Sequence, residues 1–140
     1  MVWHKEEFHI STDKSKLSLP YIHEYLSQRS YWAAGIPFST VEKSVEGSMC
    51  FGVYTDEQQI GFARVITDTA TFAYLADVFI DEAFRGRGLS KWLMQVILDH
   101  PELQGLRRFM LATRDAHELY RKFGFTGVDE PARLMQKGYR

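Results

Sequence analysis

The sequence predicts an α/β fold in which one mixed, mostly antiparallel β-sheet is flanked by helices. Three consecutive segments are rich in β-branched and aromatic residues and are separated by short polar turns, as in an antiparallel meander: 48–55, 60–68 and 71–80. Apolar residues then recur at helical spacing from Leu89 to Ile97, which predicts an amphipathic helix. A further strand is expected at 106–113, so the sheet continues beyond this helix.

The N-terminal part adds a strand and two helices. The strand is expected at 5–11. A helix near 18–29 follows, because Ser18 is a suitable N-cap, Pro20 suits the first helical turn and apolar residues share one face. A second helix is expected at 38–46, after a loop that contains glycine and proline.

The C-terminal half completes the predicted sheet. Strand 71–80 is apolar on both faces except for Asp77, which indicates a central position. After strand 106–113, the stretch "DAHELYRKFGF" predicts a helix of about two turns, and a last strand is expected at 132–137. The predicted order of elements is β-α-α-β-β-β-α-β-α-β.

Length and composition limit the function classes. The 140 residues suit one domain, 1–140, and 45% hydrophobic with 25% charged residues is typical of a soluble globular protein. A net charge of −1 disfavours nucleic acid and anionic membranes as partners. The lone Cys50 excludes an internal disulfide, and the histidines lack metal-ligand spacing, so we expect no metal. We see no signal peptide or apolar membrane span and expect a cytoplasmic protein.

The stretch "FRGRGLSKWL", residues 84–93, predicts an anion site at the start of a helix. Its two glycines have no Cβ, so a ligand can approach the main chain closely. The first amides of a helix lack internal partners and carry partial positive charge, to which Arg85, Arg87 and Lys91 add full charges. A diphosphate group fits such a site.

Other motifs with similar physics do not match this stretch. A dinucleotide-binding fingerprint needs a third glycine where Lys91 stands, and the Walker A pattern is absent. A further hypothesis is that the stretch "RGRG", together with Arg107 and Arg108, contacts nucleic acid. It is disfavoured by the net charge of −1.

Two motifs resemble those of the GNAT superfamily of N-acetyltransferases. Segment 74–98 is similar to the family's acetyl-CoA-binding motif, a strand followed by [Q/R]-x-x-G-x-[G/A], with Arg85, Gly88 and the small but deviating Ser90 at the signature positions. The second motif is N-x-x-A-x-x-[F/L]-Y followed by a G-F pair. Thr113 replaces its asparagine, and the matching residues are Ala116, Leu119, Tyr120, Gly124 and Phe125.

The resemblance implies a fold, a co-substrate and a binding mode. In this family two neighbouring parallel strands, here 71–80 and 106–113, splay apart and admit the pantetheine arm of acetyl-CoA. Main-chain groups of Val78, Phe79 and Ile80 would hold the pantetheine and thioester. The pyrophosphate would be held by the loop residues Arg85, Gly86, Arg87, Gly88, Leu89, Ser90 and Lys91.

The resemblance also implies catalytic roles. Tyr120 matches the tyrosine that donates a proton to the thiolate leaving group, the alternative being a core aromatic residue. Asp77 is the candidate general base, because burial beside the thioester could raise its pKa; the alternative is a hydrogen-bonded structural aspartate. His117, His23 or a chain of waters could serve as the base instead.

The expected function is acetyl-CoA-dependent acetylation of a primary amine on a small molecule or a peptide. The aromatic loop residues Tyr31, Trp32 and Phe38 are candidates for the acceptor site, or else they pack over the core. A non-catalytic acyl-CoA-binding or sensor domain on the same fold is the alternative. The resemblance is also compatible with a homodimer, because dimers are frequent in the family.

Overall fold

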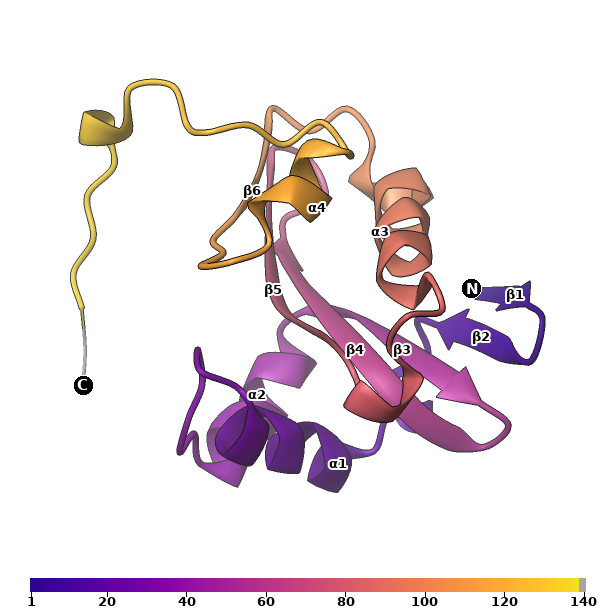
Figure 1. Cartoon of the computed structure of the whole chain (residues 1–140). Coiled ribbons are helices and arrows are strands. Elements are labelled where there is room, and N and C mark those ends of the chain that lie inside the picture. The colour runs from indigo at the N-terminus through magenta and orange to yellow at the C-terminus, as the bar shows by residue number, and fades with distance from the viewer. Residues whose placement is uncertain (139–140) are drawn as a thin grey trace.

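The strands form one six-stranded sheet with the order β1-β2-β3-β4-β5-β6. A computed structural model describes residues 1–138. The strands are β1 (Val2–Lys5), β2 (Phe8–Ser11), β3 (Met49–Thr55), β4 (Gln58–Thr67), β5 (Phe72–Ile80) and β6 (Arg108–Leu111). Neighbouring strands are antiparallel except β5 and β6, which are parallel. The predicted mixed, mostly antiparallel sheet flanked by helices is therefore confirmed (Figure 1).

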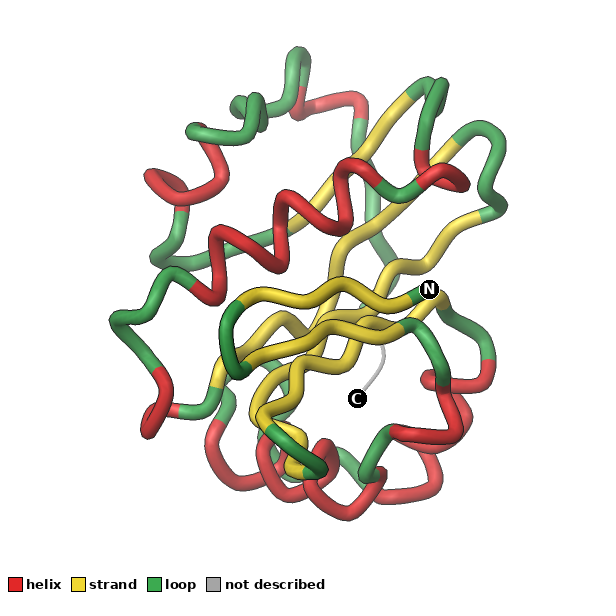
Figure 2. Tube along the Cα trace, turned by 90° about the vertical axis from the view of Figure 1, so that its right-hand side faces the viewer, coloured by secondary structure: helices red, strands yellow, loops and turns green. Residues whose placement is uncertain are grey.

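Helices cover both faces of this sheet, as Figure 2 shows. The helices are α1 (Leu19–Glu24), which continues as a π-helical turn (Tyr25–Arg29), α2 (Phe38–Glu46), α3 (Leu89–Asp99) and α4 (His117–Arg121). Short 3-10 turns lie at Lys14–Lys16, Glu82–Phe84, Pro101–Leu103 and Pro131–Arg133. The predicted cap of α1 is confirmed, because the Tyr21 amide donates to Ser18 Oγ at 3.3 Å.

Two cores stabilise the two helix–sheet interfaces. Residues of α1 and α2, such as Ile22 and Val41, are buried against Phe62 and Phe79. On the other face, residues of α3 and α4 are buried against Phe51, Val53, Val65 and Leu75. Alternate strand residues point to opposite faces, so β4 and β5 supply side chains to both cores. The predicted central position of β5, between β4 and β6, is confirmed.

One sequence expectation was too simple and another was wrong. The strand expected at 5–11 is confirmed from Phe8 to Ser11 as β2, but a turn at Glu6, with a φ of 55°, separates it from a further strand, β1, with which it forms a hairpin. The strand expected at 132–137 is not part of the sheet, because a 3-10 turn occupies Pro131–Arg133 and the chain then leaves the body of the molecule (Figure 1). At Glu6 and at Pro131–Arg133, a turn interrupts a segment whose composition is typical of a strand.

Gly61 marks the tightest approach between strands near the end of β5. A Cβ atom on Gly61 would lie 2.8 Å from Ile80 Cδ1, 2.9 Å from the Phe79 carbonyl oxygen and 3.1 Å from Val53 Cβ. The strand pairing therefore requires glycine at this position.

We predict that Gly61→Ala lowers the free energy of unfolding by about 1–3 kcal/mol, because the added methyl group must displace main chain in a packed sheet. Gly47→Ala is the matched control, since a Cβ there meets only the Lys43 carbonyl oxygen at 3.8 Å. Urea unfolding followed by circular dichroism measures both. Equal stability of the two variants would contradict the proposed tight packing.

Candidate active site

The site begins where β5 and β6 stop pairing. Their parallel register runs from Phe72 opposite Arg108 to Leu75 opposite Leu111, and it ends there. β5 continues to Ile80 in contact with β4 alone. The two strands that the sequence predicted to be parallel neighbours are therefore adjacent, and a gap opens between them beyond Leu75.

A β-bulge bends β5 at the start of this gap. The register of β4 and β5 shifts between Phe62 and Arg64, opposite Ala76 and Phe79. Asp77 lies in the bulge with a φ of 56°, which is unfavourable for a residue with a side chain. Bulges re-aim strands and side chains, and they are frequent beside active sites.

Each oxygen of the Asp77 carboxylate accepts one hydrogen bond. Arg64 Nε donates to Oδ2 at 2.9 Å, and Trp32 Nε1 donates to Oδ1 at 2.9 Å. Arg64 also donates to Ser48 Oγ at 3.1 Å. These contacts favour the alternative of a hydrogen-bonded structural aspartate, which holds the bulge and the Trp32 indole, and the role of Asp77 as general base stays an untested prediction.

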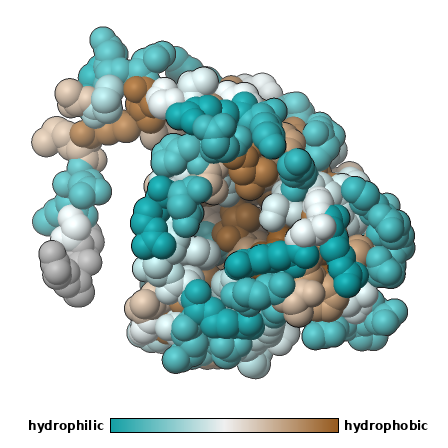
Figure 3. Space-filling model, in the orientation of Figure 1, coloured by the Kyte–Doolittle hydropathy of each residue, from teal (hydrophilic) through white to brown (hydrophobic). Residues whose placement is uncertain are grey.

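Two cavities open on either side of the gap. The larger, about 730 Å³, lies beside the glycine loop and the start of α3, and the smaller, about 510 Å³, lies between β5 and the loop after β6. They share the lining residues Tyr31, Trp32, Val78, Asp115, Ala116 and Tyr120. Figure 3 shows a hollow in this face of the molecule, with a hydrophobic floor and a hydrophilic rim.

Most of the predicted cofactor residues line the larger cavity. They are Val78, Phe79, Ile80, Arg85, Gly86, Gly88, Leu89, Ser90 and Lys91. The Arg87 side chain does not line this cavity, because its guanidinium lies over the rings of Phe8 and Phe84, 5.9 and 5.6 Å from their centroids. A contact of the Arg87 amide with the pyrophosphate stays a prediction.

The glycine loop leaves open space for a ligand. Gly86 and Gly88 have φ angles of 81° and 74°, and a Cβ on either would meet nothing within 4 Å. Gly88 is the N-cap of the eleven-residue helix α3, so the first amides of α3 have no intrahelical acceptor. The loop and helix start therefore fit a diphosphate group.

The pairing of β4 with β5 decides which main-chain groups face the gap. The Asp81 amide donates to the Ile60 carbonyl at 2.8 Å, so Asp81 faces β4. Main-chain groups alternate along an antiparallel pair, so Phe79 also faces β4, whereas Ile80 faces the gap. Consistently, Arg85 Nε approaches the Ile80 carbonyl oxygen at 3.4 Å from the side away from β4. Of the three residues expected to hold the pantetheine arm, Ile80 therefore directs its main-chain groups toward the gap, and Phe79 directs them toward β4.

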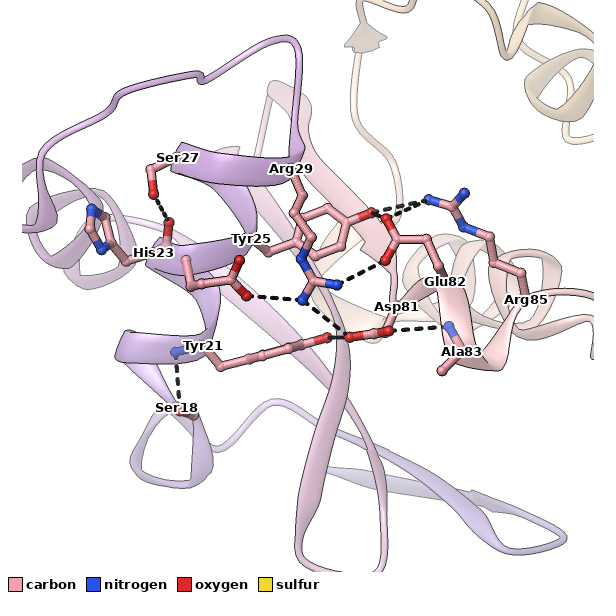
Figure 4. A network of polar contacts seen from close by, with 11 residues as sticks. Ser18, Tyr21, His23, Tyr25, Ser27, Arg29, Asp81, Glu82, Ala83 and Arg85 are labelled. Atoms are coloured by element: carbon pink, nitrogen blue, oxygen red, sulfur yellow. Dashed lines mark hydrogen bonds and ion pairs between the residues drawn. The ribbon is translucent and has the colours of Figure 1, made fainter.

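A polar cluster, which we call the clamp, anchors the turn before the glycine loop to the π-helical turn (Figure 4). Arg29 donates to Glu82 at 2.9 Å and to Asp81 at 3.3 Å. Tyr21 donates to Asp81 at 2.9 Å, and Arg85 donates to the Tyr25 hydroxyl at 3.1 Å. Arg85 is therefore engaged in the clamp rather than directed freely at a phosphate.

The clamp also contacts β5 through aromatic stacking. The Tyr25 ring stacks on Phe79 with centroids 3.8 Å apart, and the Arg29 guanidinium lies 4.5 Å from the Tyr25 centroid on the ring face. Sequence reasoning missed Tyr25 and Arg29. Their spacing of four residues places them on the same face of the predicted helix, and this was the sequence feature that could have pointed to them. The π-helical turn that directs both side chains toward β5 could not be predicted from that spacing.

Tyr120 lies where the two cavities meet. Its side chain is buried, and its hydroxyl makes no hydrogen bond among residues 1–138. Burial, assisted by the nearby Tyr31, raises the pKa of Tyr120 above the ordinary phenol value. A phenol is protonated at neutral pH at its ordinary pKa, and the raised pKa extends this protonated, proton-donating form to more alkaline pH.

Two of the three predicted aromatic loop residues reach the gap. Tyr31 and Trp32 line both cavities, and the Arg114 guanidinium lies 3.7 Å from the Tyr31 ring centroid. The Arg114 amide donates to the Tyr31 hydroxyl at 3.2 Å, so this loop bridges the gap to the segment after β6. Phe38 is a correction, because it packs edge-on against His23 at 5.4 Å and lines neither cavity.

Thr113, which stands where the second motif has asparagine, orders the start of α4. The Ala116 amide donates to Thr113 Oγ1 at 3.0 Å, which holds the turn that leads to Tyr120. Within residues 1–138, no three His, Cys, Asp or Glu side chains group as metal ligands. None of the helices in that part is long and apolar enough to cross a membrane.

Comparison with known proteins matches this geometry to a family. The family model "Acetyltransferase (GNAT) family" matches residues 12–125. A Gibberella zeae protein named "Putative acetyltransferase" is 32% identical, over 86% of this chain and 79% of that protein.

Solved structures agree with the same assignment. The crystal structure of a GNAT-family protein from Xanthomonas campestris pv. campestris is 52% identical and superposes with a TM-score of 0.92, covering 94% of this chain and 93% of that one. A GNAT acetyltransferase from Elizabethkingia anophelis, solved with acetyl-CoA bound, shares the fold at 15% identity, with a TM-score of 0.67 over 89% of this chain and 80% of that one. The chain therefore belongs to the GNAT acetyltransferase family.

Proposed function

We propose that this protein transfers an acetyl group from acetyl-CoA to a primary amine. The observation that carries the proposal is the position of Tyr120, a buried phenol between a cavity lined by the glycine loop and a second, smaller cavity. Donor and acceptor would enter from opposite sides and meet at the gap between β5 and β6.

The donor side has the groups that acetyl-CoA needs. The amides at the start of α3 and the open space over Gly86 and Gly88 would receive the pyrophosphate. The main-chain amide of Ile80, which faces the gap, would hydrogen-bond the pantetheine arm in place of the missing strand partner. When bound, acetyl-CoA supplies the activated thioester.

Tyr120 would then handle the proton of the leaving group. A departing thiolate needs a proton, and the Tyr120 phenol is protonated throughout the neutral pH range. Its hydroxyl makes no hydrogen bond within residues 1–138, so the donor is not already committed to another acceptor.

The acceptor side suits a cationic amine that loses a proton before it attacks. Tyr31, Trp32 and Tyr74 supply aromatic walls, on which an ammonium group can bind. Asp115 adds an exposed carboxylate at the rim of both cavities. Because both Asp77 oxygens are engaged, we assign Asp77 to positioning Trp32, and the amine releases its proton to solvent in the open cavity.

Calorimetric titration with acetyl-CoA, CoA and ATP, followed by thiol-release assays with a panel of amines, tests the proposal. We expect binding of both CoA species, little binding of ATP, and turnover with at least one amine. Binding without turnover by any amine would support the sensor-domain alternative. No binding of acetyl-CoA would contradict the proposal.

We predict that Gly88→Val weakens acetyl-CoA binding by about 10- to 100-fold, because the side chain enters the space from which the charged phosphates meet the helix amides. Gly105→Val is the matched control, since Gly105 has a similar φ of 71° and an equally open surrounding. Both variants incur backbone strain, but only Gly88 lines the cavity. Equal loss of affinity in both variants, by calorimetry, would show a stability effect instead.

We predict that Tyr120→Phe lowers kcat by about 100-fold and leaves the Kd for acetyl-CoA nearly unchanged. In the unmodified protein, kcat should fall at alkaline pH as the phenol, whose pKa is raised, loses its proton. That alkaline limb should vanish in Tyr120→Phe.

Tyr54→Phe is the matched control for this prediction. Tyr54 is also a buried tyrosine, and its hydroxyl has no hydrogen-bond partner within the described chain, but it lies outside both cavities. Steady-state kinetics across pH compares the two variants. Full activity of Tyr120→Phe would show that Tyr120 is only a core residue.

A further inference from the structure

The smaller cavity carries a cation that the proposed acetyl transfer leaves unused. Among the described residues that line this cavity, Arg114 is the only basic one. Arg114 does not line the larger cavity, where Arg85 and Lys91 lie beside the glycine loop. The positive charge of Arg114 is therefore on the acceptor side of the gap, away from the site that fits the pyrophosphate.

Contacts with Tyr31 hold Arg114 in place. The Arg114 guanidinium lies over the Tyr31 ring, 3.7 Å from its centroid, and the Arg114 amide donates to the Tyr31 hydroxyl at 3.2 Å. The hydrogen bond from the Ala116 amide to Thr113 Oγ1, at 3.0 Å, orders the same segment. A side chain that is already held by its neighbours loses less conformational freedom when a ligand binds to it.

The N–H groups of this guanidinium are open to a ligand. Within residues 1–138 it meets one acidic group, the Asp115 carboxylate, at 4.0 Å, which is too long for a hydrogen bond. The Arg114 side chain is 66% exposed. A guanidinium presents a planar fork of donors that matches two oxygens of a carboxylate or a phosphate. Arg114 therefore has the geometry and the free donors to bind an anionic group.

The order of charges along the cavity gives a bound acceptor a direction. Asp115 and Tyr120 line both cavities, whereas Arg114 lines only the smaller of the two. An ammonium group beside Asp115 would lie toward the reacting centre at Tyr120. An anionic group on the same molecule would lie farther into the smaller cavity, at Arg114. This arrangement complements a molecule that carries both charges.

We propose that Arg114 binds an anionic group of the acceptor, so that the acceptor is a small amine that also carries a carboxylate or a phosphate. The inference rests on the proposed acetyl transfer and names its substrate class. After the ammonium group loses a proton to solvent, the amine forms the C–N bond as the thioester C–S bond breaks. Tyr120 protonates the thiolate, and the proton that the new amide nitrogen loses restores the phenol. Arg114 holds the far end of the acceptor and takes no part in proton transfer.

Paired amines test this inference in thiol-release assays. Each amine that is turned over is compared with a counterpart that differs only in the anionic group, such as L-phenylalanine with phenethylamine, for a carboxylate, and O-phosphoethanolamine with ethanolamine, for a phosphate. We expect kcat/KM to be about tenfold or more higher for the anionic member, and the pairs that show this difference identify the anion. Equal or lower kcat/KM for the anionic members would overturn the inference and leave acetyl transfer standing. No turnover of any amine would overturn both.

Arg114→Gln shows whether the preference comes from this side chain. For the anionic acceptor we expect kcat/KM to fall about 10- to 100-fold, mainly through KM. For the counterpart without the anionic group, kcat/KM should stay within about twofold, as should the Kd for acetyl-CoA.

Arg121→Gln is the matched control, because the Arg121 side chain is 58% exposed, pairs with Glu118 at 2.7 Å and lines neither cavity. This variant should keep the preference of the unmodified protein. A loss in Arg114→Gln that is equal for both members of a pair, or the same loss in Arg121→Gln, would overturn the inference.

Discussion

The arrangement of the site depends on the loss of hydrogen bonding between β5 and β6 after Leu75 and Leu111. Parallel strands need a long crossover, and here that crossover contains α3. The carboxyl end of β5, the N-terminus of α3 and the segment after β6 therefore meet at one edge of the sheet. Ligands of open α/β sheets bind at such edges, because unpaired main-chain donors and a helix N-terminus are available there.

Keeping this gap open requires that β5 be held from its other sides. The bulge at Asp77 is fixed by Arg64, and Gly61 allows β4 to approach Ile80 closely. From the helical layer, Tyr25 stacks on Phe79 and Arg29 bonds the turn that follows β5. The residues that make these contacts position β5, and we assign no catalytic step to them. They hold the strand whose free edge would bind the pantetheine arm.

The sequence predicted the parts that depend on local chemistry. The Ser18 cap, the helix after the glycine loop and the meander of β3, β4 and β5 follow from capping, periodicity and turn composition. The glycine loop could be predicted because two glycines interleaved with arginines stand directly before an amphipathic helix, where main-chain amides are open to an anion. The same pattern, with the second motif, pointed to the family that the comparisons confirm.

What the sequence could not predict depends on long-range contacts. Asp77 looked like an isolated buried acid, because its partner Arg64 lies on a neighbouring strand across a bulge. Arg85 and Arg87 were expected to add charge at the phosphate site, and their contacts with Tyr25, Phe8 and Phe84, which come from distant parts of the chain, could not be read from the sequence. Phe38 shared an aromatic loop with Trp32, yet it begins α2 and packs on His23.

The most direct measurement is amide hydrogen–deuterium exchange with and without acetyl-CoA, because it locates bound main chain residue by residue. The central claim is that the free edge of β5 and the start of α3 bind the co-substrate. We predict slower exchange in peptides that cover Val78–Ile80 and Gly86–Lys91, with α2 unchanged. Protection elsewhere in the chain, with none at these two segments, would contradict the claim.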